Sequence, residues 1–203
     1  MSIKAVTFDY GGVIVGTPSS DFNARICAII GISEDKFLEE YFKINHRLNK
    51  EGITLKQLFT DLLIILGKED RQDEVMAALE NSFLKDKTIN EPVLNLIKKL
   101  KSSGYKTAIL SNNTVENAKN MRTQLSDYFD AILVSMEIGA QKPEPAAFEQ
   151  LFTALGVSPE ETVFIDDSTK SLSTAIEIGY HPILFRSFED LHSQLIKLGV
   201  TID

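Results

Sequence analysis

Short apolar runs alternate with longer amphipathic segments over most of the chain. The apolar runs are rich in β-branched residues and end in polar or glycine residues, which is typical of buried strands in a parallel sheet. We expect five such strands, at residues 3–8, 106–110, 131–134, 162–165 and 181–185. Residues 91–103, 114–125, 145–155, 171–178 and 188–198 have the patterns of helices. This alternation predicts right-handed βαβ units, with helices on both faces of the sheet.

Residues 17–88 interrupt the alternation. They are expected to form four helices in succession, at residues 20–30, 33–48, 54–66 and 71–84. Ser33 and Thr54 are residues that commonly begin helices. A helical block placed directly after the first strand is an insertion. We therefore expect a core of residues 1–16 and 89–203, and a helical cap of residues 17–88 over the strand ends.

Composition and charge narrow the class of protein. The 203 residues are 43% hydrophobic and 25% charged, with only 6 Pro, which is the profile of a folded globule. The net charge of −8 argues against general nucleic-acid binding, which requires a basic surface. No apolar run approaches the ~18 residues of a membrane span, and no signal peptide is apparent. We expect a cytoplasmic protein without nucleic-acid or membrane partners, in which the single cysteine, Cys27, is a small core residue.

Polar residues follow three of the predicted strands. Asp9 follows the first, Ser111 and Asn112 follow the second, and Asp166 and Asp167 follow the fourth. In a parallel sheet, ligands bind outside the carboxyl ends of the strands. We therefore expect these side chains to converge on one edge of the sheet.

Lys142, in the loop of residues 139–145, adds an ammonium group to this set. Paired carboxylates bind Mg²⁺ through oxygen, and the cation neutralises phosphoryl charge. A lysine and a hydroxyl group near a helix start can hold the remaining phosphate oxygens. A further carboxylate can attack phosphorus and form an aspartyl-phosphate. The set is therefore suited to phosphate chemistry.

Four motifs resemble those of the haloacid dehalogenase superfamily. They are Phe-Asp-Tyr-Gly-Gly-Val-Ile at 8–14, Ile-Leu-Ser-Asn-Asn at 109–113, Gly-Ala-Gln-Lys-Pro-Glu-Pro at 139–145 and Val-Phe-Ile-Asp-Asp-Ser at 163–168. They occur in the order of that superfamily, and the resemblance spans the whole chain. It implies an α/β fold: a Rossmann-like three-layer core with a parallel sheet in the strand order 5-4-1-2-3, and an inserted four-helix cap of the C1 type.

The resemblance also implies a metal site. Asp9 would be both the nucleophile and a ligand of Mg²⁺. The carbonyl group of Gly11 and the carboxylate of Asp167 would be further ligands, and Asp166 would bind directly or through water. The implied reaction is the hydrolysis of a small phosphomonoester, such as a sugar phosphate or a similar metabolite, by a monomer or homodimer.

The phosphoryl group would be held by residues of the first three motifs. Ser111 and Lys142 are the main ones implied, together with Asn112, Gly11 and Gly12. Lys142 would have a second, catalytic role, because its charge offsets the charge of the nucleophile.

Gly11 departs from the pattern of the superfamily. Most of its phosphatases carry a second Asp at this position, as the general acid that protonates the leaving group. The match is therefore closer to the branches of sugar-phosphate phosphatases and epoxide-hydrolase amino-terminal domains, some of which also have Gly there. A general acid is worth roughly 10²- to 10⁴-fold in rate, or about 3–5 kcal/mol. Without it, we expect a preference for anomeric sugar phosphates, aryl phosphates or acyl phosphates, or protonation by a cap residue or water.

Two alternative functions stay open. A 2-haloacid dehalogenase of the same superfamily also uses an Asp nucleophile without the second Asp. The pair Asp166 and Asp167 favours Mg²⁺ and phosphate over this reaction. A binding or regulatory protein that has kept the fold and lost turnover is the other alternative, and Gly11 is the residue that supports it.

Overall fold

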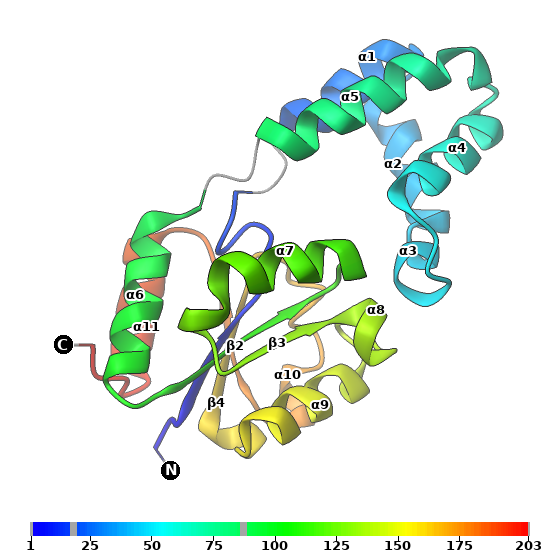
Figure 1. Ribbon diagram of the computed structural model, residues 1–203. Helices are drawn as coiled ribbons and strands as arrows, with labels where there is room; N and C mark the ends of the chain where they lie inside the picture. Colours follow the sequence, from blue (N-terminus) through cyan, green and yellow to red (C-terminus); the bar gives the residue numbers. More distant parts are fainter. Residues whose placement is uncertain (1, 17–19, 86–88, 203) are drawn as a thin grey trace. The chain divides into compact units, whose positions relative to one another are not determined.

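The computed structural model of the chain describes residues 2–16, 20–85 and 89–202. It divides into two compact units, Met1–Val15 with Ile89–Asp203 and Gly16–Thr88 (Figure 1). The boundaries predicted from the sequence adjoin residues 17–19 and 86–88, which lie outside the described residues.

The first unit is built on a parallel sheet of five strands. The strands are β1 (Ala5–Phe8), β2 (Lys106–Ser111), β3 (Ala131–Val134), β4 (Thr162–Asp166) and β5 (His181–Leu184). Their order is β3-β2-β1-β4-β5, which confirms the predicted order. β1 lies in the middle, and Phe8 pairs with both Ile109 and Ile165. The carboxyl ends of β1, β2 and β4 therefore lie side by side at one edge of the sheet.

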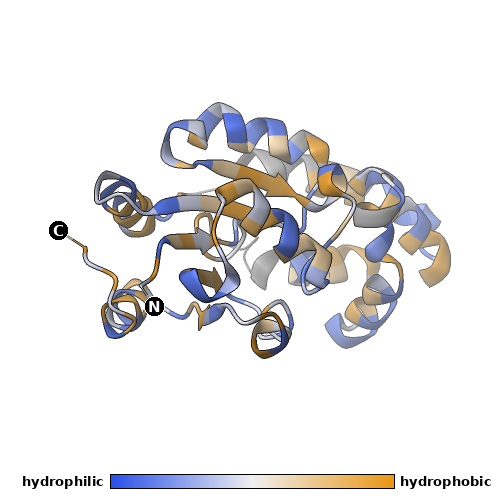
Figure 2. Ribbon diagram, turned by 90° about the horizontal axis from the view of Figure 1, so that it is seen from below, coloured by the Kyte–Doolittle hydropathy of each residue, from blue (hydrophilic) through white to orange (hydrophobic). Residues whose placement is uncertain are grey.

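Helices cover both faces of the sheet, because the strand residues alternate between two cores. Phe8 and Ile165 belong to one core and Phe164 to the other, and all three are fully buried. The first core includes residues of α6 (Glu91–Ser102), α7 (Val115–Leu125) and α11 (Phe188–Lys197), and the second includes residues of α9 (Pro145–Leu155) and α10 (Ala175–Ile178). In Figure 2 the strands are mainly orange, whereas the surrounding helices carry both colours. The predicted three-layer α/β fold is confirmed.

Two segments of the first unit differ from the prediction. Residues 171–174 form turns, so that the helix predicted at residues 171–178 is reduced to the four residues of α10. Hydroxyl side chains explain this difference, because Ser173 and Thr174 donate hydrogen bonds to backbone carbonyl groups outside α10. The sequence pattern does not predict the other segment, the short helix α8 (Ser135–Ile138) after β3.

The second unit consists of helices with a core of their own. They are α1 (Ser20–Ile30), α2 (Glu34–Ile44), α3 (His46–Lys50), α4 (Leu55–Leu66) and α5 (Gln72–Lys85), with a 3₁₀ turn at Glu69–Arg71. Phe37 and Phe59 are buried in this core, and their ring centroids are 6.2 Å apart. Cys27 is also buried there, as expected of a small core residue.

The helix predicted at residues 33–48 is divided at Asn45. The backbone N–H of Asn45 donates to the carbonyl of Tyr41, as in an α-helix, but that of Leu48 donates to the carbonyl of Asn45, only three residues away. Asn is a poor helix former because its side chain competes for backbone groups. The described part of the second unit thus has five α-helices instead of the predicted four.

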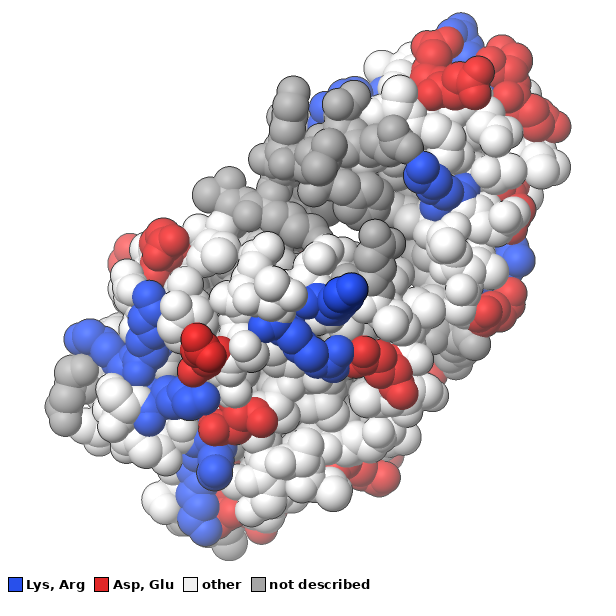
Figure 3. Space-filling model, in the orientation of Figure 1, with Lys and Arg blue, Asp and Glu red and all other residues white. Residues whose placement is uncertain are grey.

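The described residues show a surface of mixed charge (Figure 3) and lack a membrane-spanning helix. On the face seen in Figure 3, Lys and Arg side chains are interspersed with Asp and Glu. Within residues 2–16, 20–85 and 89–202, no helix is both long and apolar enough to cross a membrane.

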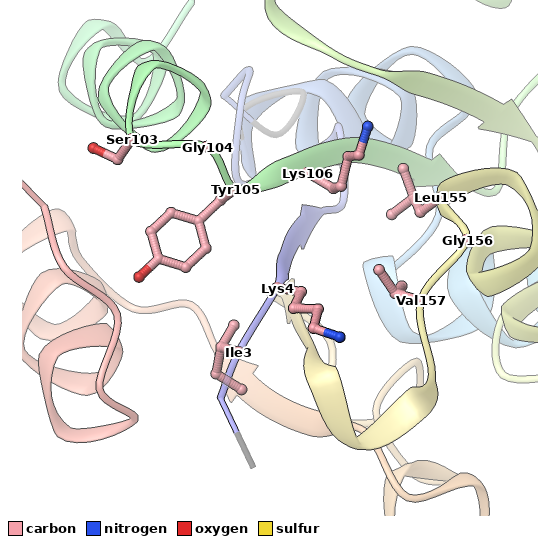
Figure 4. A pocket seen from close by; sticks show the side chains of 9 residues that line it. All are labelled: Ile3, Lys4, Ser103, Gly104, Tyr105, Lys106, Leu155, Gly156 and Val157. Carbon is pink, nitrogen blue, oxygen red and sulfur yellow. The ribbon is translucent and has the colours of Figure 1, made fainter.

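A hollow of about 370 Å³ lies at the amino ends of β1 and β2. Lys4, Tyr105, Lys106 and Leu155 are among the residues that line it (Figure 4). Because the strands are parallel, this is the edge of the sheet opposite to the one at which Asp9 follows β1. The hollow contains none of the residues expected to carry chemistry.

Candidate active site

A tight loop after β1 holds Asp9 at the carboxyl edge of the sheet. The backbone N–H of Asp9 donates to the carbonyl of Ile165 at 2.8 Å, so that this residue continues the strand pairing. The chain then folds back, and the N–H of Val15 donates to the carbonyl of Tyr10 at 3.0 Å. The N–H of Tyr10 donates to Asp9 Oδ1 at 2.7 Å. This bond orients the Asp9 carboxylate.

The ammonium group of Lys142 lies between two carboxylates. Its Nζ is 2.8 Å from Asp9 Oδ1 and 2.5 Å from Asp166 Oδ2. The Lys142 side chain is only 2% exposed, and a buried charge requires a partner of opposite sign. Nζ also lies 5.2 Å from the centroid of the Phe164 ring, in a favourable cation–π contact. The Lys142 ammonium group is therefore paired with both Asp9 and Asp166.

The two neighbouring carboxylates of the last motif have different surroundings. Asp166 is fully buried, and its Oδ1 accepts a hydrogen bond from the N–H of Ser168 at 2.8 Å. Asp167 is exposed. Asp9, Asp166 and Asp167 each offer an oxygen, and these oxygens lie within 4.8 Å of one another. Such a cluster of carboxylates could hold a hard divalent cation.

Burial changes the acidity of Asp9. It raises the pKa of Asp9 from 3.8 to about 6, against the lowering effect of the Lys142 charge. The pKa of Asp167 is also raised, because the surrounding protein displaces part of the water around its otherwise exposed carboxylate and because Asp166 carries a like charge. Three negative charges exceed the single positive charge of Lys142. A bound cation would therefore stabilise the ionised carboxylates.

Gly12 makes room for Asp167. Its φ is +74°, and a Cβ atom at this position would overlap the Asp167 carboxylate. The backbone must therefore approach Asp167 without a side chain between them. Gly11 is different, because no described atom lies within 4 Å of the position of its Cβ and its φ is not positive.

The other predicted phosphate-binding residues differ in their contacts. Ser111 is the last residue of β2 and is 3% exposed. The Asn112 side chain instead binds the backbone of Lys142: its Oδ1 accepts the Lys142 N–H at 2.8 Å, and its Nδ2 donates to the Lys142 carbonyl at 2.9 Å. Sequence reasoning misses this contact, because the two residues are 30 positions apart.

Thr174 is a further residue near the site that no motif marks. Its hydroxyl group donates to the carbonyl of Pro143, the residue after Lys142, at 3.0 Å. The contact depends on the turns of residues 171–174, which the sequence pattern predicts as helix. No signal in the sequence could therefore have identified it.

Fold and site together define a Rossmann-like protein with an acidic, lysine-paired centre at the carboxyl edge of its sheet. The family model of haloacid dehalogenase-like hydrolases matches residues 3–179, and the chain belongs to this family. The resemblance that the four motifs indicate is thereby confirmed.

The chain is similar in sequence and structure to several enzymes. The chain is 30% identical over 220 residues to bifunctional epoxide hydrolase 2 of Sus scrofa, covering 98% of this chain and 39% of that protein. It is 26% identical over 189 residues to D-ribitol-5-phosphate phosphatase of Bacteroides thetaiotaomicron, covering 88% and 89%. A haloacid dehalogenase family enzyme of that bacterium, solved with magnesium and inorganic phosphate, has a TM-score of 0.69 at 26% identity, covering 91% and 95%. The chain spans only 18% to 39% of the length of four of the curated relatives that it matches, including this epoxide hydrolase.

The variant Gly12→Ala should weaken the binding of a divalent cation, because the added methyl group overlaps Asp167 and its φ of +74° disfavours a side chain. We expect a loss of roughly tenfold or more in Mg²⁺ affinity, measured by calorimetry. Gly11→Ala is the matched control, since it adds the same group in open space. If both variants bind Mg²⁺ as tightly as the wild type, Asp167 does not hold the cation.

The variant Asp9→Asn should be more stable than the wild type at pH 7 in the absence of metal. Folding raises the pKa of Asp9 from 3.8 to about 6, so the folded state binds the proton more tightly and the stability falls as the pH rises between these values. The penalty above pH 6 is at most about 3 kcal/mol, and a neutral Asn avoids it. Urea unfolding in EDTA at several pH values measures this difference, which should shrink towards pH 4. A variant less stable at pH 7 would mean that the ion pair with Lys142 outweighs the cost of burial.

Proposed function

We propose that the chain is a Mg²⁺-dependent phosphatase that hydrolyses a small phosphomonoester through an aspartyl-phosphate on Asp9. The observation that carries this proposal is the cluster of Asp9, Asp166 and Asp167 around the Lys142 ammonium group at one sheet edge. The similarity to a sugar-alcohol phosphate phosphatase and to an enzyme solved with magnesium and phosphate supports it.

Asp9, Asp167 and the carbonyl group of Gly11 would hold the Mg²⁺ ion directly. Asp166, whose two oxygens accept hydrogen bonds from Lys142 and Ser168, would contact it directly or through water. When bound, the cation supplies positive charge that neutralises the phosphoryl oxygens.

Asp9 would be the nucleophile. Tyr10 and Lys142 both donate to Oδ1, which leaves Oδ2 to attack phosphorus. The bond between phosphorus and the leaving oxygen breaks as the new O–P bond forms. Ser111 and Lys142 would hold the phosphoryl oxygens during this transfer. Water then cleaves the aspartyl-phosphate, which releases inorganic phosphate and restores Asp9.

Gly11 bears on the class of substrate. It provides no acid to protonate the leaving group, so substrates whose leaving group departs easily would lose least. These are anomeric sugar phosphates, aryl phosphates and acyl phosphates. Positioning and electrostatic stabilisation, which supply much of the catalysis of phosphoryl transfer, do not depend on this acid.

Gly11 also favours a second candidate, a binding protein of the same fold without turnover. A 2-haloacid dehalogenase is less well supported, because three clustered carboxylates suit a cation and a phosphate ester better than a haloacid.

The purified protein should release phosphate from p-nitrophenyl phosphate in the presence of Mg²⁺, and EDTA should abolish this release. Asp9→Asn should lower the rate to the background, because it removes the nucleophile. A colorimetric phosphate assay measures both effects. Equal rates for the wild type and this variant on a broad panel of phosphate esters would favour the binding protein. Hydrolysis of a 2-haloacid in EDTA would favour the dehalogenase.

The variant Gly11→Asp should accelerate the hydrolysis of alkyl phosphates, such as glycerol phosphate, by up to roughly 100-fold, because it supplies the general acid. The open space and ordinary φ at this position can accommodate the side chain. The rate on p-nitrophenyl phosphate should change little, since its leaving group needs little protonation. Gly11→Asn is the control of equal size without the acid. Equal changes on the two esters would show that the leaving group is not limiting.

A further inference from the structure

The loop that carries Lys142 is anchored by side chains from two other parts of the fold. Asn112, directly after β2, binds both backbone polar groups of Lys142, at 2.8 and 2.9 Å. Thr174, just before α10, binds the carbonyl of the next residue, Pro143, at 3.0 Å. Three consecutive backbone polar groups, from the Lys142 N–H to the Pro143 carbonyl, are thus bound by side chains.

The bond pattern of Asn112 depends on its side-chain amide. The amide offers an acceptor and a donor at a fixed separation, as a peptide group does, so it pairs with Lys142 as a neighbouring strand would. This pairing fixes both the position and the orientation of the Lys142 backbone. Alanine at position 112 would make neither bond.

Anchoring the backbone matters because the Lys142 side chain is flexible. A lysine ammonium group sits on a four-carbon stem with many rotamers, and its Nζ must lie within 2.8 Å of Asp9 and 2.5 Å of Asp166 at once. The side chain rests on the Phe164 ring, at 5.2 Å from Nζ, and is 2% exposed. A shift of the backbone by about 1 Å is enough to cost roughly 100-fold in rate.

We infer that Asn112 is a positioning residue that acts through Lys142, with Thr174 as a second anchor of the same loop, rather than a ligand of the phosphoryl group. The expected effect of Asn112 on the reaction rate rests on the proposed function. Its expected effect on the structure, the placement of Lys142 Nζ beside Asp9, does not rest on that function.

A double-mutant cycle tests the inference. Asn112→Ala should lower kcat/KM by roughly 10- to 100-fold in the wild type, and Thr174→Val should act in the same direction. In the Lys142→Ala background, the same substitutions should have almost no effect on kcat/KM or on the affinity for inorganic phosphate with Mg²⁺, since the group through which they act is gone. Calorimetry with phosphate provides this readout even where the residual activity is too low to measure.

Direct contact between Asn112 and phosphate is the competing explanation, because the amide keeps a second N–H. It predicts that Asn112→Ala weakens phosphate binding equally with and without Lys142, and this result would overturn the inference. Gln150→Ala is the matched control: it removes a side-chain bond to the carbonyl of Ile138, just before the loop, and should leave kcat/KM unchanged.

A crystal structure of Asn112→Ala separates this inference from the proposed function. We expect Lys142 Nζ to move away from Asp9 Oδ1, whatever the activity of the protein. An unchanged Lys142 in a folded variant would overturn the inference and leave the phosphatase proposal intact. A wild type that neither binds nor releases phosphate would overturn the proposed function, while the position of Nζ would still decide the inference.

Discussion

The buried ammonium group of Lys142 is the feature on which the rest of the site depends. At 2% exposure its charge needs an opposite charge beside it, and the carboxylates of Asp9 and the fully buried Asp166 lie on either side of it. Asp167 adds a third negative charge to a centre that has one lysine. The excess of two negative charges matches a divalent cation. Burial is the main reason why the pKa of Asp9 is raised, and the charge of Asp166 adds to it against the lowering effect of Lys142.

The core fold could be predicted because buried parallel strands leave a simple trace in the sequence. Residues 131–134 and 162–165 are short apolar runs, and the structure forms strands there with almost the same bounds. The strand order followed from the family motifs, since periodicity alone does not specify it. The predicted helix bounds were wrong where local side chains compete with the backbone for hydrogen bonds, as at Asn45, Ser173 and Thr174. The sequence thus indicates which segments are helical better than where each helix ends.

The features of the site also fall into those that the sequence predicts and those that it does not. Asp9, Asp166 and Ser111 lie at the same edge of the sheet because the strand register places their strand ends side by side, and this placement follows from topology. The bonds of Asn112 to Lys142 and the approach of Asp167 to Gly12 depend instead on the geometry of loops. Residues 30 or more positions apart meet in them, so no local pattern could reveal them. The resemblance could therefore assign Asn112 to the phosphate, whereas its observed partner is the backbone of Lys142.

The two glycines that follow Asp9, Gly11 and Gly12, differ in what the backbone requires of them. Gly12 is demanded by the fold, since its φ is positive and any side chain would collide with Asp167. Gly11 is under no such constraint, because its φ is ordinary and the space beside it is open. Packing among the described residues therefore does not account for the absence of an acid at position 11. An acidic side chain could be accommodated there, so if the proposed function holds, the leaving group is the first property to establish about the substrate.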